Sequence, residues 1–232
     1  LFTVLFVAVM CYVILMLFKY LSKKKEEKPE TGGIKNIIFD VGQVLVDYDW
    51  ETYLDSFGFE PAKRERIAKA TFQSPVWDER DRGLYEEDVY LKQFQELDPE
   101  DAEDIEKVIR GTGGTIHKRP YADTWVKYLK SKGYHVYILS NYSSYMLDHT
   151  KKELTFRREM DGEVFSCYAK QLKPDAEIYQ IILNKYQLKP EECVFIDDRS
   201  ENCRGAQEQG IHTICFKDFK QVTADLEKLG VK

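Results

Sequence analysis

Apolar and polar positions divide the chain into three regions. Residues 1–18 are apolar and carry no charged side chain, whereas residues 22–33 are mostly charged and end in Thr-Gly-Gly. From about residue 34 onward, short apolar runs alternate with segments in which apolar residues recur at helical spacing. The pattern predicts a globular domain that begins at residue 34, behind a solvated linker and an N-terminal apolar segment.

In the second half of the chain, helical spacing and short apolar runs follow one another in regular order. Strands that alternate with crossover helices form a parallel sheet whose faces are covered by helices. The sequence therefore predicts an α/β core made of residues 34–49 and 116–232. Its strands are expected at residues 35–40, 134–141, 193–198 and 212–216, and its helices at residues 121–132, 175–186, 201–209 and near the C-terminus.

A long insertion separates the first two of these strands. Residues 50–115 are rich in Glu, Asp, Lys and Arg, with apolar residues at helical spacing. This length exceeds that of a simple crossover, because connections in compact domains are usually short. We therefore expect residues 50–115 to fold as a helical cap.

Residues 1–21 have the character of a transmembrane anchor. As a helix, the apolar run spans roughly 27 Å at about 1.5 Å per residue, which is close to the thickness of a bilayer core. Five lysines follow between residues 19 and 28, and the positive-inside rule then places the folded domain at the cytoplasmic face. If residues 1–21 are an anchor, residues 22–33 are the linker to the folded domain. A buried core helix and a later start of translation are the alternatives to an anchor.

Composition limits the ligands that the domain can take. The 232 residues are 43% apolar and carry a formal charge of −6, so a broad basic surface for nucleic acid is not expected. The five cysteines lack CxxC spacing and are interpreted as reduced cytosolic thiols, and the four histidines show no metal-binding motif. A small anionic metabolite, held by a metal and a few donors, is compatible with this composition.

Polar side chains stand where the apolar runs end. Carboxyl ends of parallel strands meet at one edge of a sheet, which is where ligands bind in open α/β folds. Each residue type alone is common in turns and helix caps. Their order along the chain is more informative, because a carboxylate, a hydroxyl, a lysine and two carboxylates follow one another. These residues are Asp40, Ser140, Asn141, Lys173, Asp197 and Asp198.

This set of side chains suits phosphoryl transfer through a phosphorylated aspartate. Asp40 can attack phosphorus and divide a difficult hydrolysis into two easier steps. Because two anions repel, Mg²⁺ bound by carboxylate oxygens, a backbone carbonyl and waters is expected as a cofactor. Lys173 adds a second positive charge, and the hydroxyl of Ser140 can donate to a phosphate oxygen.

Four segments resemble the ordered motifs of the haloacid dehalogenase superfamily of phosphatases. They read IIFDVGQVLVD, VYILSN, LKPDAEIY and VFIDD, and the resemblance extends over most of residues 34–232. It implies a Rossmann-like core with a small helical cap. It also implies that Asp40 is the nucleophile, Ser140 a phosphate ligand and Lys173 the charge that steadies both.

The resemblance further implies a magnesium site, with one departure from the family's pattern. Asp40, Asp198 and, through water, Asp197 are the implied ligands, together with the backbone carbonyl of Gly42. Most phosphatases of the superfamily carry at position 42 an aspartate that protonates the leaving oxygen and activates water. Gly42 keeps the backbone carbonyl but has no side chain that can act as acid or base. This implies a slow enzyme, a substrate with a good leaving group, or another residue, such as Asp47, in the role of the acid.

The first motif also resembles a bacterial branch that includes glucose-1-phosphate phosphatase-like proteins. An anomeric phosphate is a comparatively good leaving group, which favours sugar phosphates as substrates. In the cap, PVWDERDRG resembles a segment of that branch. Trp77 and Arg82, with Asn141 from the core, are therefore the expected substrate-binding residues. A core tryptophan and arginines paired at the surface are the alternatives.

The resulting hypothesis is an Mg²⁺-dependent phosphatase of small phosphorylated metabolites, held at the cytoplasmic face of the membrane. A metal-independent haloacid dehalogenase is a less favoured alternative, because Asp197 and Asp198 have no role in it. Another alternative is a weakly active or inactive membrane-tethered protein that binds a phosphorylated ligand, and Gly42 keeps this reading open. The oligomeric state is not predicted.

Overall fold

The computed structural model describes residues 33–232. The predicted anchor, residues 1–21, and nearly all of the predicted linker, residues 22–33, lie outside the described residues. Within residues 33–232, no helix is both long enough and apolar enough to cross a membrane. Membrane attachment through the N-terminal segment therefore stays a prediction.

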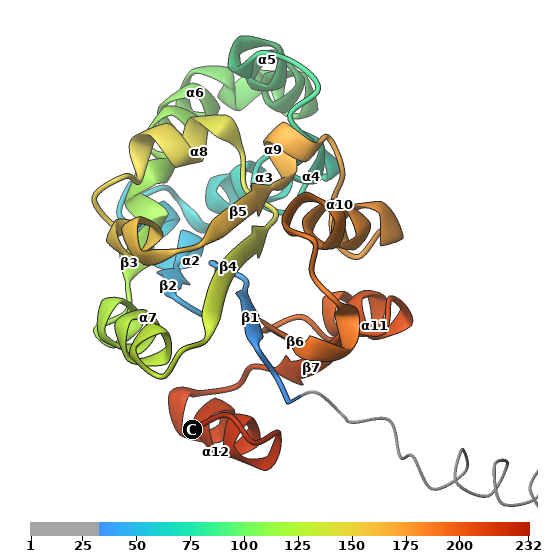
Figure 1. Cartoon of the computed structure of the whole chain (residues 1–232). Coiled ribbons are helices and arrows are strands. Elements are labelled where there is room, and N and C mark those ends of the chain that lie inside the picture. Colours follow the sequence, from blue (N-terminus) through green and yellow to red (C-terminus); the bar gives the residue numbers. More distant parts are fainter. Residues whose placement is uncertain (1–32) are drawn as a thin grey trace, which may run out of the picture. The chain divides into compact units, whose positions relative to one another are not determined.

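A five-stranded parallel sheet forms the centre of the domain (Figure 1). Its strand order is β5-β4-β1-β6-β7, so the first strand of the chain lies in the middle of the sheet. Every pairing in this sheet is parallel, which confirms the predicted α/β core. The strands are β1 (Asn36–Phe39), β4 (His135–Ser140), β5 (Gly162–Phe165), β6 (Cys193–Asp197) and β7 (His212–Cys215).

Alternate residues of β1 pack on opposite faces of the sheet. Ile37 and Phe39 belong to the apolar core shared with α7 and α12, whereas Ile38 packs with α10 and α11. All three side chains are fully buried. Burial on both faces explains why this strand reads as an unbroken apolar run. The covering helices are α7 (Ala122–Ser131), α10 (Ala176–Tyr186), α11 (Ser200–Glu208) and α12 (Phe219–Lys228).

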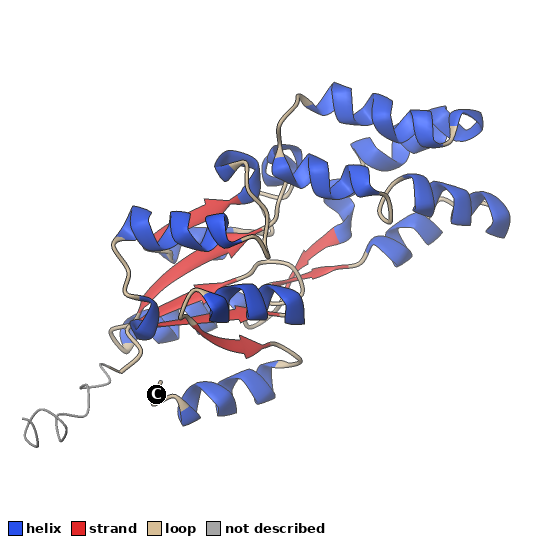
Figure 2. Cartoon of the chain, turned by 90° about the vertical axis from the view of Figure 1, so that its right-hand side faces the viewer, coloured by secondary structure: helices blue, strands red, loops and turns tan. Residues whose placement is uncertain are grey.

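The insertion folds into a helical cap beyond one end of the sheet (Figure 2), as predicted. It has an apolar core of its own, in which Leu54, Ile67 and Phe94 are fully buried. Proline opens α3 and α4, where its missing N–H has no helical partner to lose. The elements are α2 (Trp50–Asp55), α3 (Pro61–Ala70), α4 (Pro75–Arg82), α5 (Glu87–Leu97), η1 (Pro99–Asp101), α6 (Ala102–Arg110) and η2 (Thr112–Thr115).

Several short elements were not predicted from the sequence. β2 (Val46–Tyr48) and β3 (Ile116–Lys118) pair in antiparallel fashion and join the cap to the core. Three residues are too few to show a period of two, so these strands read as loop. Their pairing brings both crossing segments of the chain together at one place. The other unpredicted elements are β5, α8 (Ser144–His149), η3 (Thr155–Glu159), α9 (Ser166–Ala169) and η4 (Pro190–Glu192).

Candidate active site

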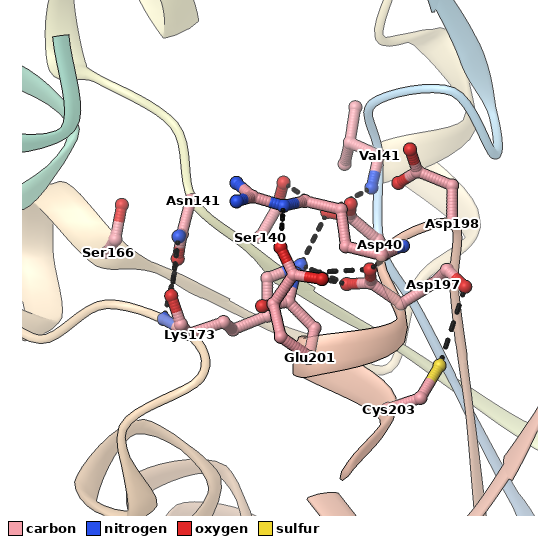
Figure 3. A network of polar contacts seen from close by, with 12 residues as sticks. Asp40, Val41, Ser140, Asn141, Ser166, Lys173, Asp197, Asp198, Glu201 and Cys203 are labelled. Carbon is pink, nitrogen blue, oxygen red and sulfur yellow. Dashed lines mark hydrogen bonds and ion pairs between the residues drawn. The ribbon is translucent and has the colours of Figure 1, made fainter. Parts of the chain in front are cut away.

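Asp40 lies directly after the central strand β1 (Figure 3). Its backbone N–H donates to the carbonyl of Ile196 at 2.9 Å, which fixes the residue against β6. One carboxylate oxygen, Oδ1, accepts from the N–H of Val41 at 2.7 Å and from the hydroxyl of Ser140 at 2.6 Å, and lies 2.8 Å from Nζ of Lys173. In the described part of the chain the other oxygen, Oδ2, accepts no hydrogen bond. This oxygen is therefore available for attack.

Lys173 lies between two buried carboxylates. Its ammonium is 2.8 Å from Asp40 and 2.6 Å from Oδ2 of Asp197, and all three residues are almost completely buried. Burial by itself lowers the pKa of Lys173, but the attraction of Asp197 and Asp40 outweighs it, and the pKa is raised. Lys173 therefore stays protonated and places one positive charge between two negative ones.

The remaining contacts of Asp197 tie it to the start of α11. Its Oδ1 accepts from the backbone N–H of Arg199 at 2.8 Å, and the side-chain amide of Asn202 donates to both carboxylate oxygens at 3.1 Å. Across residues 33–232, no other residue forms a hydrogen bond or an ion pair with the side chain of Asp198. The geometry therefore leaves Asp198 free for direct metal coordination, whereas Asp197 is used within the protein.

Asp40, Asp197 and Asp198 form an acidic cluster whose ligand oxygens lie within 4.8 Å of one another. Burial raises the pKa of Asp40 to about 6 against the attraction of Lys173, and the charge of Asp197 adds to the rise. Burial, and then Asp197, also raises the pKa of Asp198. Three carboxylates face one ammonium, so the cluster holds excess negative charge that a hard divalent cation can neutralise. This donor set fits Mg²⁺, and Gly42 lines the same cavity.

Asn141, predicted as a substrate ligand, pairs with the backbone of Lys173. Its amide nitrogen donates to the Lys173 carbonyl at 3.0 Å, and its oxygen accepts from the Lys173 N–H at 2.9 Å. The pair holds the segment that carries the ammonium against the end of β4. Asn141 also lines the cavity above the cluster, so the structure leaves its contact with substrate untested.

The acidic cluster opens into a cavity between the core and the cap. The main cavity has a volume of about 450 Å³, and a second of about 100 Å³ shares part of its lining. Trp77 lies in the wall of both and packs against Tyr48 with ring centroids 6.1 Å apart. The residues that line both cavities are Asp40, Gly42, Tyr48, Trp77, Asp81 and Asn141.

The structure does not place Arg82 in either cavity. Its guanidinium pairs with Glu79 at 3.3 Å on the same helix. Trp77 and Asp81, four residues apart, lie on the face of α4 that lines the cavity, and Arg82 falls on another face. Helical geometry therefore favours the alternative stated above, an arginine paired near the surface.

Asp81 also lines both cavities, although the sequence did not mark it as a candidate site residue. It stands between two arginines in the segment ERDR, which reads as the charged face of a helix. The signal that could have found it is its helical spacing from Trp77. Burial raises the pKa of Asp81 to about 7, although Arg80 opposes the rise. Asp47, by contrast, does not line either cavity but pairs with Arg119 at 2.9 Å, and its side chain is 51% exposed.

Comparison with known families identifies the fold and the type of chemistry. The sequence profile of the haloacid dehalogenase-like hydrolases matches residues 34–210. The chain belongs to this family. The matched region contains the acidic cluster, Lys173 and the complete cap, so the site described above is that of a haloacid dehalogenase-like hydrolase.

Individual relatives are more distant. Flavin mononucleotide hydrolase 1 of Arabidopsis thaliana is 24% identical over 210 residues, which cover 90% of this chain and 83% of that protein. D-ribitol-5-phosphate phosphatase of Bacteroides thetaiotaomicron is 27% identical over 191 residues, covering 78% and 90%. A haloacid dehalogenase family enzyme of the same bacterium, crystallised with magnesium and inorganic phosphate, superposes with a TM-score of 0.66 at 23% identity, covering 82% and 99%. This structural likeness shows a shared fold.

Proposed function

We propose that the protein is an Mg²⁺-dependent phosphatase that hydrolyses small phosphorylated metabolites through a phosphorylated Asp40. One observation carries the proposal: Asp40 presents a free carboxylate oxygen at a cavity of about 450 Å³, held against Lys173 and grouped with two further carboxylates. Membership of a hydrolase family supports the reaction type. The magnesium and phosphate bound by the similar Bacteroides enzyme support the choice of ion and ligand.

Each side chain of the core then has a defined role. Oδ2 of Asp40 attacks phosphorus, while the N–H of Val41 and the ammonium of Lys173 orient the carboxylate and balance its charge. Ser140 lies 2.6 Å from Asp40 and so beside the phosphate that Asp40 attacks, where its hydroxyl can donate to a phosphate oxygen. Asp40, Asp198 and the Gly42 carbonyl would hold Mg²⁺, which would supply positive charge that offsets the repulsion between carboxylate and phosphate.

The cavity suits a substrate with one phosphate and a chain of hydroxyl groups. Aromatic rings of Tyr48 and Trp77 form part of its wall, and polar side chains such as Gln43, Ser74 and Arg199 form another part. The substrates named for two relatives, flavin mononucleotide and D-ribitol 5-phosphate, both carry phosphate on the primary carbon of a ribityl chain. We therefore favour polyol and sugar phosphates, with glucose 1-phosphate as the candidate from the first motif.

Phosphate release from a defined panel tests this function. The full chain is incubated with D-ribitol 5-phosphate, flavin mononucleotide, glucose 1-phosphate and p-nitrophenyl phosphate, in Mg²⁺ or in EDTA. Turnover is expected in Mg²⁺, with a loss of at least about 10³-fold in Asp40→Asn because the nucleophile is removed. Asp47→Asn, an acidic residue outside the cavity, is the matched control. Halide release from 2-chloropropionate in EDTA would instead support a dehalogenase, and phosphate binding without turnover would support a binding protein.

The N-terminal segment carries a separate proposal about location. We propose that residues 1–21 anchor the domain at the cytoplasmic face, on the strength of the uncharged run and the lysines that follow it. Fractionation of cells that express the full chain, beside a chain that starts after Lys28, tests the proposal. The full chain is expected in the membrane fraction and the shorter one in the supernatant, and recovery of both in the supernatant would refute it.

A further inference from the structure

An alkoxide that leaves phosphorus needs a proton from an acidic group. The core residues around Asp40 already have other proposed roles, so the acid has to be another residue of the cavity. Four carboxylates of the described residues line the main cavity: Asp40, Asp78, Asp81 and Asp198. Asp40 is the proposed nucleophile and Asp198 a proposed metal ligand. Asp78 is exposed and lines the main cavity alone, whereas Asp81 also lines the smaller cavity beside Asp40 and Ser140. Resting on the proposed phosphatase function, we propose that Asp81 of the cap is the general acid and base of the reaction.

The end of α4 that carries Asp81 is fastened to the core. The Asp81 carbonyl accepts from the hydroxyl of Ser166 at 2.6 Å, and the carbonyl of Gly83 accepts from the Lys170 ammonium. Gly83 has φ of +70°, and a β-carbon there would lie 2.9 Å from Cα of Cys167. The glycine thus lets α4 end in direct contact with α9. This contact holds the end of α4, and with it Asp81, at the cavities that Asp40 also lines.

The neighbouring arginine does not neutralise Asp81 through an ion pair. Arg80 is 1% exposed, pairs with Glu87 at 2.6 Å and stacks near the rings of Trp77 and Tyr145, with its guanidinium 5.2 and 5.0 Å from their centroids. Arg80 lines neither cavity. Arg80 is therefore paired with Glu87, and it lowers the pKa of Asp81 from a distance without forming an ion pair with its carboxylate.

Electrostatics around Asp81 suit a group that gives and takes a proton near neutrality. Burial raises its pKa to about 7, Arg80 lowers it, Asp78 raises it, the Ser143 N–H lowers it and Asp40 raises it. An acid of this strength is protonated often enough to donate and ionised often enough to accept. The other titratable groups that feel its charge are Tyr48 on β2, Tyr142 after β4 and Cys167 on α9, and burial raises the pKa of each of them.

Gly42 leaves room on the opposite wall. No atom lies within 4 Å of the position that a β-carbon would take at Gly42, and the residue lines both cavities with Asp81. The cavity therefore tolerates a carboxylate at position 42. A second acid can be introduced there by substitution, which gives the proposal a gain-of-function test.

The proposed proton transfers balance over the two steps. In the first, Oδ2 of Asp40 bonds to phosphorus, the bond from phosphorus to the leaving oxygen breaks, and protonated Asp81 gives its proton to that oxygen. In the second, the Asp81 carboxylate takes a proton from water, the water oxygen bonds to phosphorus, and the bond to Asp40 breaks. The alcohol and inorganic phosphate leave, and both carboxyl groups return to their starting states.

Leaving-group dependence distinguishes this role from a structural one. In the full chain with Mg²⁺, Asp81→Asn is expected to lower kcat for D-ribitol 5-phosphate by about 10²–10³-fold, since an alkoxide needs the proton. For p-nitrophenyl phosphate, whose leaving anion is stable, the loss in the first step is small, and a burst of p-nitrophenolate is expected before slow hydrolysis. Glu79→Gln on the same helix, exposed and outside both cavities, is the control and is expected to match wild type.

A second variant keeps the outcome clear if Asp81→Asn is merely misfolded. Gly42→Asp in the Asp81→Asn background is expected to recover at least about tenfold in kcat for D-ribitol 5-phosphate, because the acid returns from the opposite wall. Equal losses for both phosphates without a burst, or no loss for either, would overturn the proposal while leaving the phosphatase function intact. Absence of phosphate release by wild type from every compound would instead overturn the function itself, and this proposal with it.

Discussion

The carboxylates at the core end of the cavity and the carboxylate that the cap places there have different surroundings. On the core, Asp40 and Asp197 lie 2.8 and 2.6 Å from the ammonium of Lys173 and accept further hydrogen bonds. On the cap, Asp81 takes part in none of the ion pairs found within residues 33–232. In the core, the positive charge of Lys173 thus holds the carboxylates in place. In the cap, Asp81 is held in place because the end of α4 is fastened to the core.

This difference suits Asp40 to stay ionised and Asp81 to give and take a proton. The attraction of Lys173 opposes the burial that raises the pKa of Asp40, and a bound cation would lower that pKa further. Asp81 forms no ion pair of this kind, although Arg80 lowers its pKa, and burial leaves that pKa at about 7, beside about 6 for Asp40 without a cation. A nucleophile needs the first environment because it must be ionised, and a general acid needs the second because it must carry a proton near neutral pH.

Removal of the core's positive charge is expected to have the largest effect. Lys173→Met is expected to lower the free energy of unfolding by about 3–5 kcal/mol in EDTA, because two buried carboxylates lose their counter-ion. Urea unfolding followed by circular dichroism measures the change. The matched control is Lys35→Met, whose ion pair with Glu192 is also 2.8 Å long but has a 59% exposed lysine, and about 1 kcal/mol or less is expected there. Similar losses in the two variants would contradict the argument from burial.

A second test replaces the missing positive charge with metal. Mg²⁺ at about 100 times its Kd stabilises the native state by about 2.7 kcal/mol, which raises Tm by several degrees in a domain of this size. Asp198→Asn is expected to lose most of this shift, because it removes the carboxylate that no protein contact engages. Thermal unfolding with Mg²⁺ or EDTA measures both, and Asp47→Asn serves as the control. A full Mg²⁺ shift in Asp198→Asn would place the ion elsewhere.

The site residues of the core could be predicted from the sequence far better than those of the cap. The central strand is buried on both faces, so its apolar run and the polar residue that ends it stand out in the chain. Parallel pairing then brings together residues as distant as Asp40, Lys173 and Asp197. Asp40 and Asp197 follow from strand order, because each lies at the carboxyl end of a strand at one edge of the sheet. Lys173 lies in the loop between α9 and α10, and its role was implied by the motif LKPDAEIY.

The cap residues could not be chosen in the same way. A helix in a small domain carries charged residues around most of its surface, and ERDR offers four of them within about one turn. The cavity takes Asp81 and leaves Arg82 outside because the two residues lie on different faces of α4, and the contact of Gly83 with Cys167 fixes where that helix ends. The short strands β2 and β3, which set where the cap attaches, have too few residues to show a pattern.

The smallest expected effect is the pH dependence of stability that Asp81 of the cap causes. A carboxyl titrates near pH 3.9 in the unfolded chain, and burial raises the pKa of Asp81 to about 7 in the folded protein. Between these values the native state binds more protons, so stability falls as pH rises, and the full cost is present above pH 7. Asp81→Asn is therefore expected to raise Tm in EDTA at pH 8, by about 2–8 °C, and by less at pH 5.5.

Thermal unfolding of wild type and Asp81→Asn at the two pH values gives this result directly, with Glu79→Gln as the exposed control on α4. A gain that grows with pH means that the fold carries an unpaired acid at a cost in stability, as expected of a residue kept for chemistry. A loss of Tm at both pH values would mean that the Asp81 carboxylate stabilises the cap in its charged form. The contrast with Asp40 would then disappear, because both walls of the cavity would hold fixed charge.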